Sequence, residues 1–320
     1  MKGVICMKVD LQGYAQEILQ KKIETYHIVV RQHDEIVGRF DFRKDNRRDN
    51  IHSVSKSFVS MAVGMAVEEG ILSLDERPAE IFRDKLPQNP SENLMNITIR
   101  DMLMMAAGHD YFVLQGYSGD PKYPGRDELT DPDWVKYALS FPVPYAPGTH
   151  WKYSNFGPYL CSVIIQDRTG KRLRDYLMPR LFDPLNIINP QWFESTAGYT
   201  LGCGGLHLNT EEMARFGQLI LNKGNWKGRQ LIPAQWVETA TSNLISNVNS
   251  GKGPDSTAGY GCYFWRCARD GACRGDGWAG QYVIVLPEQD ACIAIMSHDF
   301  NKQGILDAVW EYVVPQLKGN

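Results

Sequence analysis

A serine and a lysine stand one helical turn apart in the segment IHSVSKSFVSMAVGMAVEEG, residues 51–70. Because Ser53 and Lys56 are three positions apart, a helix would carry both side chains on one face. Ser53 would lie at the start of that helix, where unpaired backbone N–H groups and the positive end of the helix dipole favour an alkoxide. The pair predicts a nucleophilic serine beside a lysine, although a helix-capping serine followed by a solvated lysine would give the same pattern.

A tyrosine and an asparagine flank one residue in the segment PGTHWKYSNFGPYL, residues 147–160. In an extended turn, Tyr153 and Asn155 would project toward the same side of the chain. The segment directly precedes a predicted helix. It is therefore a candidate for a second wall of a site, and an ordinary turn is the alternative.

The stretch GDGWAG, residues 275–280, matches the G-x-G-x-x-G pattern of dinucleotide-binding proteins. In that motif the phosphate lies at the N-terminus of a helix that follows the glycines. Here the residues that follow, QYVIVLPEQDACIAIMS, predict a strand, a turn and a second strand. Without a helix after the glycines, the stretch does not predict a nucleotide phosphate site.

Taken in chain order, these patterns resemble the serine β-lactamase and penicillin-binding protein superfamily, which carries Ser-x-x-Lys, Tyr-Ser-Asn and a glycine-bearing triplet on a C-terminal strand. The sequences SVSK and YSN most resemble those of its class C β-lactamase and family VIII esterase branch. The segment LGCGGLHLNTEEMARFGQLILNKG, residues 201–224, is similar to the glycine-rich turn and following helix of that branch. The likeness runs from about Ile28 to the C-terminus, and the matching third triplet is Trp278-Ala279-Gly280.

The resemblance implies acyl transfer through a covalent ester on Ser53, with Lys56 and Tyr153 as the acid–base pair. An ordinary tyrosine titrates near about 10, so it is no base at neutral pH without help. We expect the lysine cation to lower the pKa of Tyr153, so that its phenolate takes the serine proton. Asn155 would hold Lys56 and an amide or carbonyl of the substrate.

The resemblance also implies an oxyanion hole formed by the backbone N–H groups of Ser53 and Gln281, with Gly280 leaving the strand edge open. Family members that act on penicillins commonly carry a cation where this chain has Trp278. An indole offers one N–H donor and no charge, so we expect a neutral ester or amide substrate, unless Arg274 restores a charge from the neighbouring strand. Aromatic residues in segments that could line the cleft are Tyr111, Tyr117, Trp151 and Trp265.

Two other functions stay open at this point. One is a true class C-type β-lactamase or a D-amino-acid peptidase of the same superfamily. The other is a non-catalytic ligand-binding protein on the same scaffold, although a pure binder has no chemical need for the combination of Ser53, Lys56, Tyr153 and Asn155. The chemistry requires no cofactor, and the dispersed histidines show no zinc-ligand spacing.

The elements that must position these residues divide between the ends and the middle of the chain. Short β-rich runs occur at both ends, and helix-like segments fill the middle, with a closing helix predicted over 305–317. The predicted fold is α/β of the α+β type, with one antiparallel sheet built from both ends, flanked by helices, and a mostly helical insertion. We expect a single catalytic unit over 1–320, with one sub-lobe formed by 1–50 plus 200–320 and the other by 51–199. The predicted strands cover 26–32, 36–42, 260–267, 281–287 and 291–297.

Composition excludes several classes of protein. Hydrophobic residues make up 43% and charged residues 22% of the chain, and the net charge is -3, which argues against nucleic-acid binding. No apolar run approaches the length of a membrane span, and the first residues lack a secretory signal pattern, so we expect a cytoplasmic protein.

Seven scattered cysteines favour free thiols, although Cys267 and Cys273 could meet across a hairpin. The expected partner is a small ester, amide or lactam; the sequence does not predict the oligomeric state.

Overall fold

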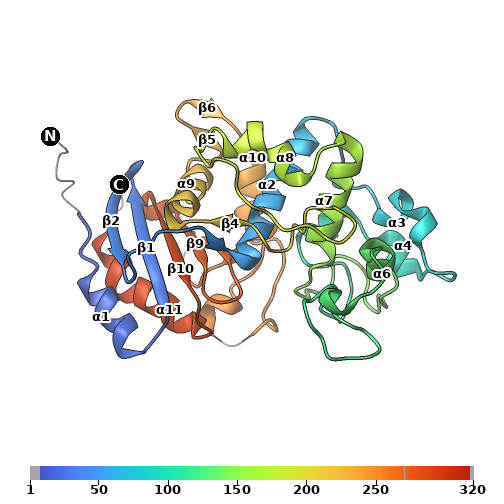
Figure 1. The fold of residues 1–320 in the computed structure, drawn as a ribbon, viewed down its shortest axis with the longest axis horizontal. Coiled ribbons are helices and arrows are strands. Elements are labelled where there is room, and N and C mark those ends of the chain that lie inside the picture. Colours follow the sequence, from blue (N-terminus) through green and yellow to red (C-terminus); the bar gives the residue numbers. More distant parts are fainter. Residues whose placement is uncertain (1–7, 252, 270, 318–320) are drawn as a thin grey trace.

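The computed structural model describes residues 8–251, 253–269 and 271–317. Figure 1 shows one sheet with helices on both of its faces and a largely helical part beside it. This mixed architecture, with an antiparallel sheet drawn from both ends of the chain, is the fold class that the sequence predicts.

The central sheet has six strands, and every neighbouring pair is antiparallel. Strand β1 from the N-terminal end pairs with β10 from the C-terminal end, so the two chain ends meet in the middle of the sheet. Their register sets Ile28 opposite Ile295 and Val30 opposite Ile293. In sheet order the strands are β2 (Glu35–Asp41), β1 (Thr25–Gln32), β10 (Ala291–Ser297), β9 (Tyr282–Leu286), β8 (Cys273–Asp276) and β7 (Trp265–Arg266).

Both faces of this sheet are buried, which explains why β1 and β10 read as nearly continuous apolar runs. Successive side chains point to opposite faces. Ile28 and Val30 therefore join a core under helices α1 (Gln12–Gln20) and α11 (Lys302–Ala308), while Val29 joins the larger core on the other face. The sheet thus separates two hydrophobic cores.

Helix α9 (Thr210–Leu221) covers the second face and packs on β1, β9 and β10. Its N-terminus is closed by a capping box, in which the side chains of Asn209 and Glu212 each accept a hydrogen bond from the other residue's backbone N–H. Gly217 allows close contact with the sheet, because a Cβ there would lie 3.2 Å from the sulfur of Cys292.

The helical part centres on α2 (Ser55–Glu68), whose residues from Ser55 to Ala66 are all buried. A helix buried on every side packs as a core element rather than as an amphipathic cover. The division into sub-lobes at residues 50 and 199 remains a prediction. The other α-helices among the described residues are α3 (Pro78–Ile81), α4 (Glu92–Asn96), α5 (Ile99–Leu103), α6 (Trp134–Leu139), α7 (Phe156–Thr169), α8 (Leu173–Leu177) and α10 (Ala234–Thr241).

Several boundaries differ from the sequence-based expectations. The strand expected over 260–267 is paired as β7 only at Trp265–Arg266, and β8, with the sequence CRGD, was not predicted as a strand. After α11 the chain continues as a π-helical turn (Val309–Val313) and a 3₁₀ turn (Val314–Gln316). The short strands pair as β3 (Asp49–Asn50) with β4 (His207–Leu208) and as β5 (Asn225–Trp226) with β6 (Arg229–Gln230).

The cysteines that the structure describes are buried free thiols. Cys267 and Cys273 lie on neighbouring segments of the β7–β8 hairpin and do not form a disulfide. Cys6 lies outside the described residues. Within the described part of the chain, no helix combines the length and the apolar character needed to cross a membrane.

Candidate active site

Ser53 lies in a short 3₁₀ turn (His52–Val54) that connects β3 to α2. His52 adopts a positive φ of 48°, a conformation that is uncommon for a residue with a side chain and often marks functional turns. Two hydrogen bonds hold the turn: the N–H of His52 donates to Asn50 Oδ1 at 2.8 Å, and the hydroxyl of Ser55 donates to the His52 carbonyl at 2.6 Å. The turn fixes Ser53 at the start of α2, as the sequence predicts.

Lys56 reaches back from the first turn of α2 to Ser53. Its Nζ lies 2.7 Å from Ser53 Oγ and 2.8 Å from the carbonyl oxygen of Cys203. The side chain is only 1% exposed, and this burial lowers the pKa of Lys56 to about 7. Near neutral pH a large share of Lys56 is therefore a neutral amine, whose lone pair can accept the serine proton while an N–H donates to Cys203.

The glycine-rich turn at residues 201–205 presents that carbonyl. Gly202 has a φ of 66°, and a Cβ there would lie 2.5 Å from the carbonyl oxygen of Pro158, so this close approach requires glycine. The N–H of Gly205 donates to Asn50 Oδ1 at 3.2 Å, the same oxygen that holds His52. Asn50 therefore ties the turn of the nucleophile to the turn that orients Lys56.

Tyr153 completes the cluster around Ser53. It shares a hydrogen bond with Ser53, and its ring centroid lies 4.9 Å from Lys56 Nζ. Burial raises the pKa of Tyr153 well above its usual range, and the hydrogen bond with Ser53 offsets this only in part. The prediction that Lys56 lowers the pKa of Tyr153 is therefore wrong. Desolvation disfavours the phenolate more strongly than the neighbouring groups stabilise it, so Lys56 is the better base.

Aromatic side chains surround Tyr153 on its outer side. Trp265 stacks on its ring with centroids 5.6 Å apart, Phe112 meets it edge to face at 5.6 Å, and Trp151 lies 6.3 Å away. Of the four aromatic residues expected near the cleft, Trp151 and Trp265 lie beside Tyr153. Tyr111 instead packs with Tyr123 and Phe141, and Tyr117 is 77% exposed.

Asn155 does not make the predicted contact with Lys56. It is the N-cap residue of α7, and its Nδ2 donates to the carbonyl of Leu114 at 2.9 Å. Its buried Oδ1 has no hydrogen-bond partner among the described residues. A buried acceptor without a partner is costly, so this oxygen is available to a ligand donor.

The backbone that approaches the Ser53 turn belongs to Gly275–Gly277, not to Gly280. A Cβ at Gly275 would lie 2.9 Å from Ser57 Oγ, and one at Gly277 would lie 2.9 Å from the carbonyl oxygen of Ile51. A Cβ added at Gly280 would lie 2.4 Å from Ser297 Oγ on β10 and 2.6 Å from Ile305 Cδ1 on α11. Gly280 is thus required for packing of the turn on α11, and its predicted place beside the oxyanion is wrong.

The N–H of Gln281 is also an unsuitable oxyanion donor. The carbonyl of Gln281 accepts a 2.7 Å hydrogen bond from the N–H of Gly277, and within one extended residue the N–H and C=O point to the same side. The N–H of Gln281 therefore faces the inside of the β8–β9 turn. The N–H of Trp278 lies in the turn that follows β8. Among the described residues it donates to no protein acceptor.

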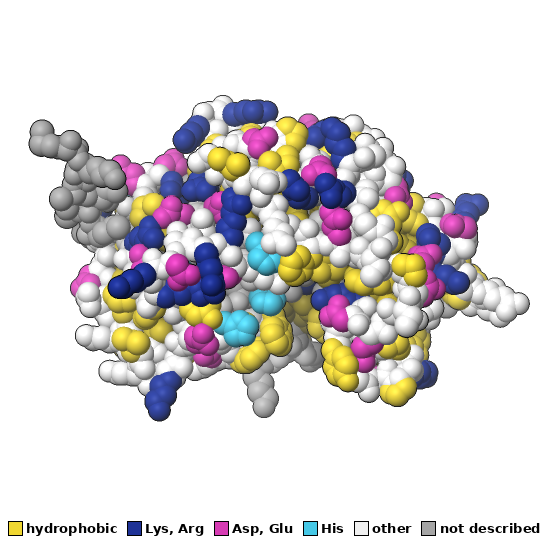
Figure 2. All heavy atoms as spheres, in the orientation of Figure 1, with side chains coloured by type: hydrophobic (Ala, Val, Ile, Leu, Met, Phe, Trp, Pro, Cys, Tyr) yellow, Lys and Arg dark blue, Asp and Glu magenta, His cyan; other side chains and the backbone are white. Residues whose placement is uncertain are grey.

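The Trp278 side chain lies at the rim of the site and is 59% exposed. Its ring centroid is 5.8 Å from that of His52 and 4.7 Å from that of Phe300. Figure 2 shows histidine side chains gathered beside hydrophobic ones near the middle of this face. Burial, followed by the charges of His298, His207 and Lys56, lowers the pKa of His52 to about 4, so this ring is neutral at physiological pH.

The structure brings Ser53, Lys56 and Tyr153 into one cluster, with Trp278 at its rim. The Cys203 carbonyl and the backbone of Gly277 and Trp278 were not predicted from the sequence. Backbone groups leave no sequence signal of their own, although the glycines around each segment indicate close approach. No group of three or more metal-ligating side chains is assembled within the described ranges. The cluster can generate a serine nucleophile and transfer its proton.

Comparison with known proteins finds that residues 20–316 match the family model named Beta-lactamase. A lovastatin esterase from Penicillium rubens is 26% identical over 200 residues, which cover 55% of this chain and 48% of the relative. An N-acetylmuramyl-L-alanine amidase from Bacillus subtilis is 23% identical over 291 residues, covering 75% of this chain and 65% of the relative. This chain therefore spans about half to two thirds of the length of these curated relatives.

Solved structures share the fold. A penicillin-binding protein homologue from Pyrococcus abyssi superposes with a TM-score of 0.73 at 16% identity, covering 92% of this chain and 75% of that one. At this identity the similarity establishes the architecture alone.

Proposed function

This chain belongs to the beta-lactamase family, and we propose that it is a serine hydrolase that forms an acyl-enzyme on Ser53. The observation that carries the proposal is the 2.7 Å contact between Ser53 Oγ and the buried Lys56 amine, whose pKa is about 7. A group that titrates near the working pH is well suited to general-base catalysis. The relatives named for ester and amide hydrolysis support the same reaction class.

In the acylation step, neutral Lys56 takes the hydroxyl proton of Ser53 as Oγ attacks the substrate carbonyl. The new C–O bond places a negative charge on the former carbonyl oxygen, which the backbone N–H groups of Ser53 and Trp278 would stabilise. When the intermediate collapses, the bond to the leaving group breaks, and the phenol of Tyr153 protonates the departing alcohol or amine. The Lys56 ammonium then returns a proton to Tyr153.

Deacylation repeats these steps with water as the nucleophile. Lys56, neutral again, accepts a proton from water as the oxygen attacks the ester carbonyl, and Ser53 leaves with a proton supplied through the same cluster. Asn155 Oδ1, which is buried and without a partner among the described residues, would accept a hydrogen bond from an N–H or O–H of the substrate.

The substrate class that we propose is a small ester or amide. The second candidate is a β-lactamase or D-amino-acid peptidase, and the relationship to an amidase favours keeping it. The two functions share the acylation step, so they differ in which leaving group the cleft accepts.

Three probes test this function when wild type is compared with Ser53→Ala. They are a 4-nitrophenyl short-chain ester, a chromogenic cephalosporin and a fluorophosphonate. Ester turnover that disappears in Ser53→Ala supports the main proposal, and faster cephalosporin turnover would favour the second candidate. Wild-type protein that neither turns over the substrates nor reacts with the fluorophosphonate would refute both.

A further inference from the structure

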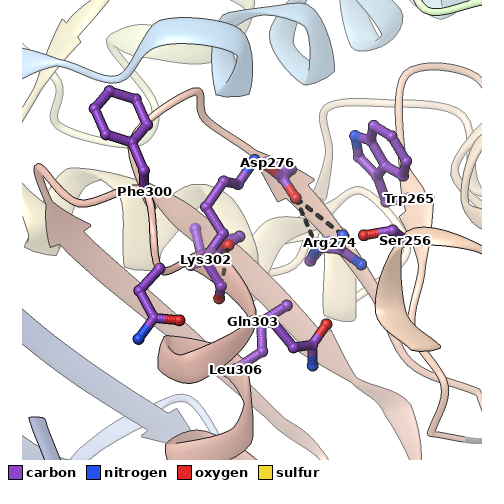
Figure 3. A pocket seen from close by; sticks show the side chains of 10 residues that line it. Ser256, Trp265, Arg274, Asp276, Phe300, Lys302, Gln303 and Leu306 are labelled. Carbon is purple, nitrogen blue, oxygen red and sulfur yellow. Dashed lines mark hydrogen bonds and ion pairs between the residues drawn. The ribbon is translucent and has the colours of Figure 1, made fainter. Parts of the chain in front are cut away.

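The strand pair β7–β8 at the edge of the sheet separates two pockets. In its register Trp265 lies opposite Arg274, and Arg266 lies opposite Cys273. Opposite residues of an antiparallel pair point to the same face, and successive residues point to opposite faces. Trp265 and Arg274 therefore line one pocket, beside α11, which Figure 3 shows from close by. Arg266 and Cys273 line another pocket, on the opposite face.

The pocket on the Arg266 side has a volume of about 420 Å³, which is within the range of small-molecule sites. Arg266, Cys273 and Val285 form one row across β7, β8 and β9 along its floor. Helices α9 and α10 supply walls that include Ile220 and Val237, and most of the lining surface is apolar. No residue of the catalytic cluster lines this pocket, so it is separate from the cleft at Ser53.

Three charged side chains line the pocket, and one of them has no counter-ion among the described residues. Lys223 Nζ lies 2.6 Å from Glu238 Oε1, and both side chains are more than half exposed, so these two charges offset each other at the rim. Arg266 is half-buried, and its Nη1 donates to the carbonyl of Thr241 at 2.7 Å. Its Nε and Nη2 have no acceptor within the described part of the chain, and they are not sealed from solvent.

Arg274 on the other face shows what a neutralised arginine looks like in this sheet. Its Nε donates to Asp276 Oδ2 at 2.9 Å, an ion pair that Figure 3 shows directly. Its charge therefore does not replace the cation that Trp278 lacks. Arg266 has no such carboxylate beside it, although a charge against apolar walls is costly unless it is paired. The Nε–Nη2 edge of a guanidinium fits a carboxylate through two parallel hydrogen bonds.

We infer that the pocket on the Arg266 side is a second ligand site, which binds a medium-chain aliphatic carboxylate. The carboxylate accepts hydrogen bonds from Nε and Nη2 of Arg266, and the chain lies against Ile220, Val237 and Val285. The apolar walls favour a ligand with an alkyl chain over a small inorganic anion, because burial of the chain adds to the free energy of binding. This site goes beyond the proposed hydrolase function and does not depend on it.

Isothermal titration calorimetry of the wild-type protein tests the site with octanoate, octan-1-ol and acetate. Octanoate combines the charge with the chain, octan-1-ol lacks the charge, and acetate lacks the chain. We expect octanoate to bind one to one, and the other two to bind at least tenfold more weakly. Arg266→Gln should weaken octanoate binding about tenfold to hundredfold, the effect of losing a hydrogen bond to a charged group.

Three further variants separate recognition from folding. Thr241→Phe leaves Arg266 in place and fills the pocket from α10, so it should also weaken octanoate binding at least tenfold. Arg266→Lys keeps the charge without the two-pronged geometry and should fall between wild type and Arg266→Gln. Arg83→Gln removes an exposed arginine of the helical part and should leave binding unchanged. Circular dichroism and thermal unfolding identify the variants that fold.

Two results would overturn the inference. One is a wild-type protein that does not bind octanoate, or binds octan-1-ol equally well. The other is octanoate binding that survives both Arg266→Gln and Thr241→Phe, because the acid would then bind elsewhere, such as the cleft at Ser53. Either result would leave the hydrolase function standing, since that function is measured by ester turnover and by labelling of Ser53.

Discussion

Lys56 shows how burial can prepare a base for catalysis. A lysine in water is protonated at neutral pH, whereas the surroundings of Lys56 lower its pKa to about 7. Tyr153 responds in the opposite direction, because burial disfavours a phenolate as strongly as it disfavours an ammonium. The two residues next to Ser53 are therefore separated into a base and an acid by the same physical cause.

The pH dependence of activity follows from this assignment. Because only neutral Lys56 can accept the serine proton, kcat/KM should rise with pH through a midpoint near 7. The measurement is a pH profile with a neutral 4-nitrophenyl ester, corrected for spontaneous hydrolysis and accompanied by Lys56→Ala as an inactive control. A profile that rises only near pH 10 would contradict the lowered pKa of Lys56.

A second prediction concerns the backbone of Trp278. Trp278→Pro removes the N–H that we assign to the oxyanion hole and should lower kcat by about 10²–10³-fold. Trp278→Ala keeps this N–H and should lose far less activity, so it is the matched control. Circular dichroism and thermal unfolding establish that both variants fold. Equal losses in the two variants would show that the side chain, not the N–H, matters.

At the scale of elements, strand β8 was the part that the sequence did not predict. The strands over 26–32 and 291–297 were predictable, because both contain long runs of β-branched and apolar residues. The sequence CRGD of β8 has no such preference and is a strand because β9 pairs with it. The glycine triplet that was expected on a C-terminal strand, Trp278–Gly280, therefore follows β8 rather than lying on it.

The close packing of Gly280 against β10 and α11 has a consequence for stability. Gly280→Ala must place a Cβ 2.4 Å from Ser297 Oγ at a positive φ of 80°. Gly228→Ala, at a φ of 83° with no atom within 4 Å of the added Cβ, carries the backbone strain alone. The first variant should therefore lose about 1–3 kcal/mol more unfolding free energy than the second, as expected for overpacking. Denaturant titration measures both, and equal losses would show that the turn is not packed on α11.

At the scale of the whole molecule, the sheet serves as a frame for parts that are distant in sequence. The turn before helix α2 supplies Ser53 and α2 itself supplies Lys56, both on one side of the sheet, while α1 and α11 cover the other side (Figure 1). The pairing of both chain ends and the Ser-x-x-Lys spacing were predictable from local patterns. The contact of Lys56 with the Cys203 carbonyl was not, because these residues are 147 positions apart and meet only in the folded chain.

The buried thiols provide a test of the whole fold. The six described cysteines are buried and unpaired, so in a Cys6→Ser variant a thiol reagent such as DTNB should label none of them rapidly in the native protein. After unfolding in guanidinium, all six should react. Rapid labelling of a native thiol would show that this part of the core is open, and fewer than six reactive thiols after unfolding would indicate a disulfide.

The central claim is that Ser53 becomes acylated, and trapping the acyl-enzyme tests it most directly. The protein is mixed with a 4-nitrophenyl ester, quenched in acid within the first turnovers and digested, and the peptide containing Ser53 is analysed by mass spectrometry. We predict an added acyl mass on Ser53 in wild type and none in Ser53→Ala. An acyl group on another residue, or undiminished ester turnover in Ser53→Ala, would contradict the account.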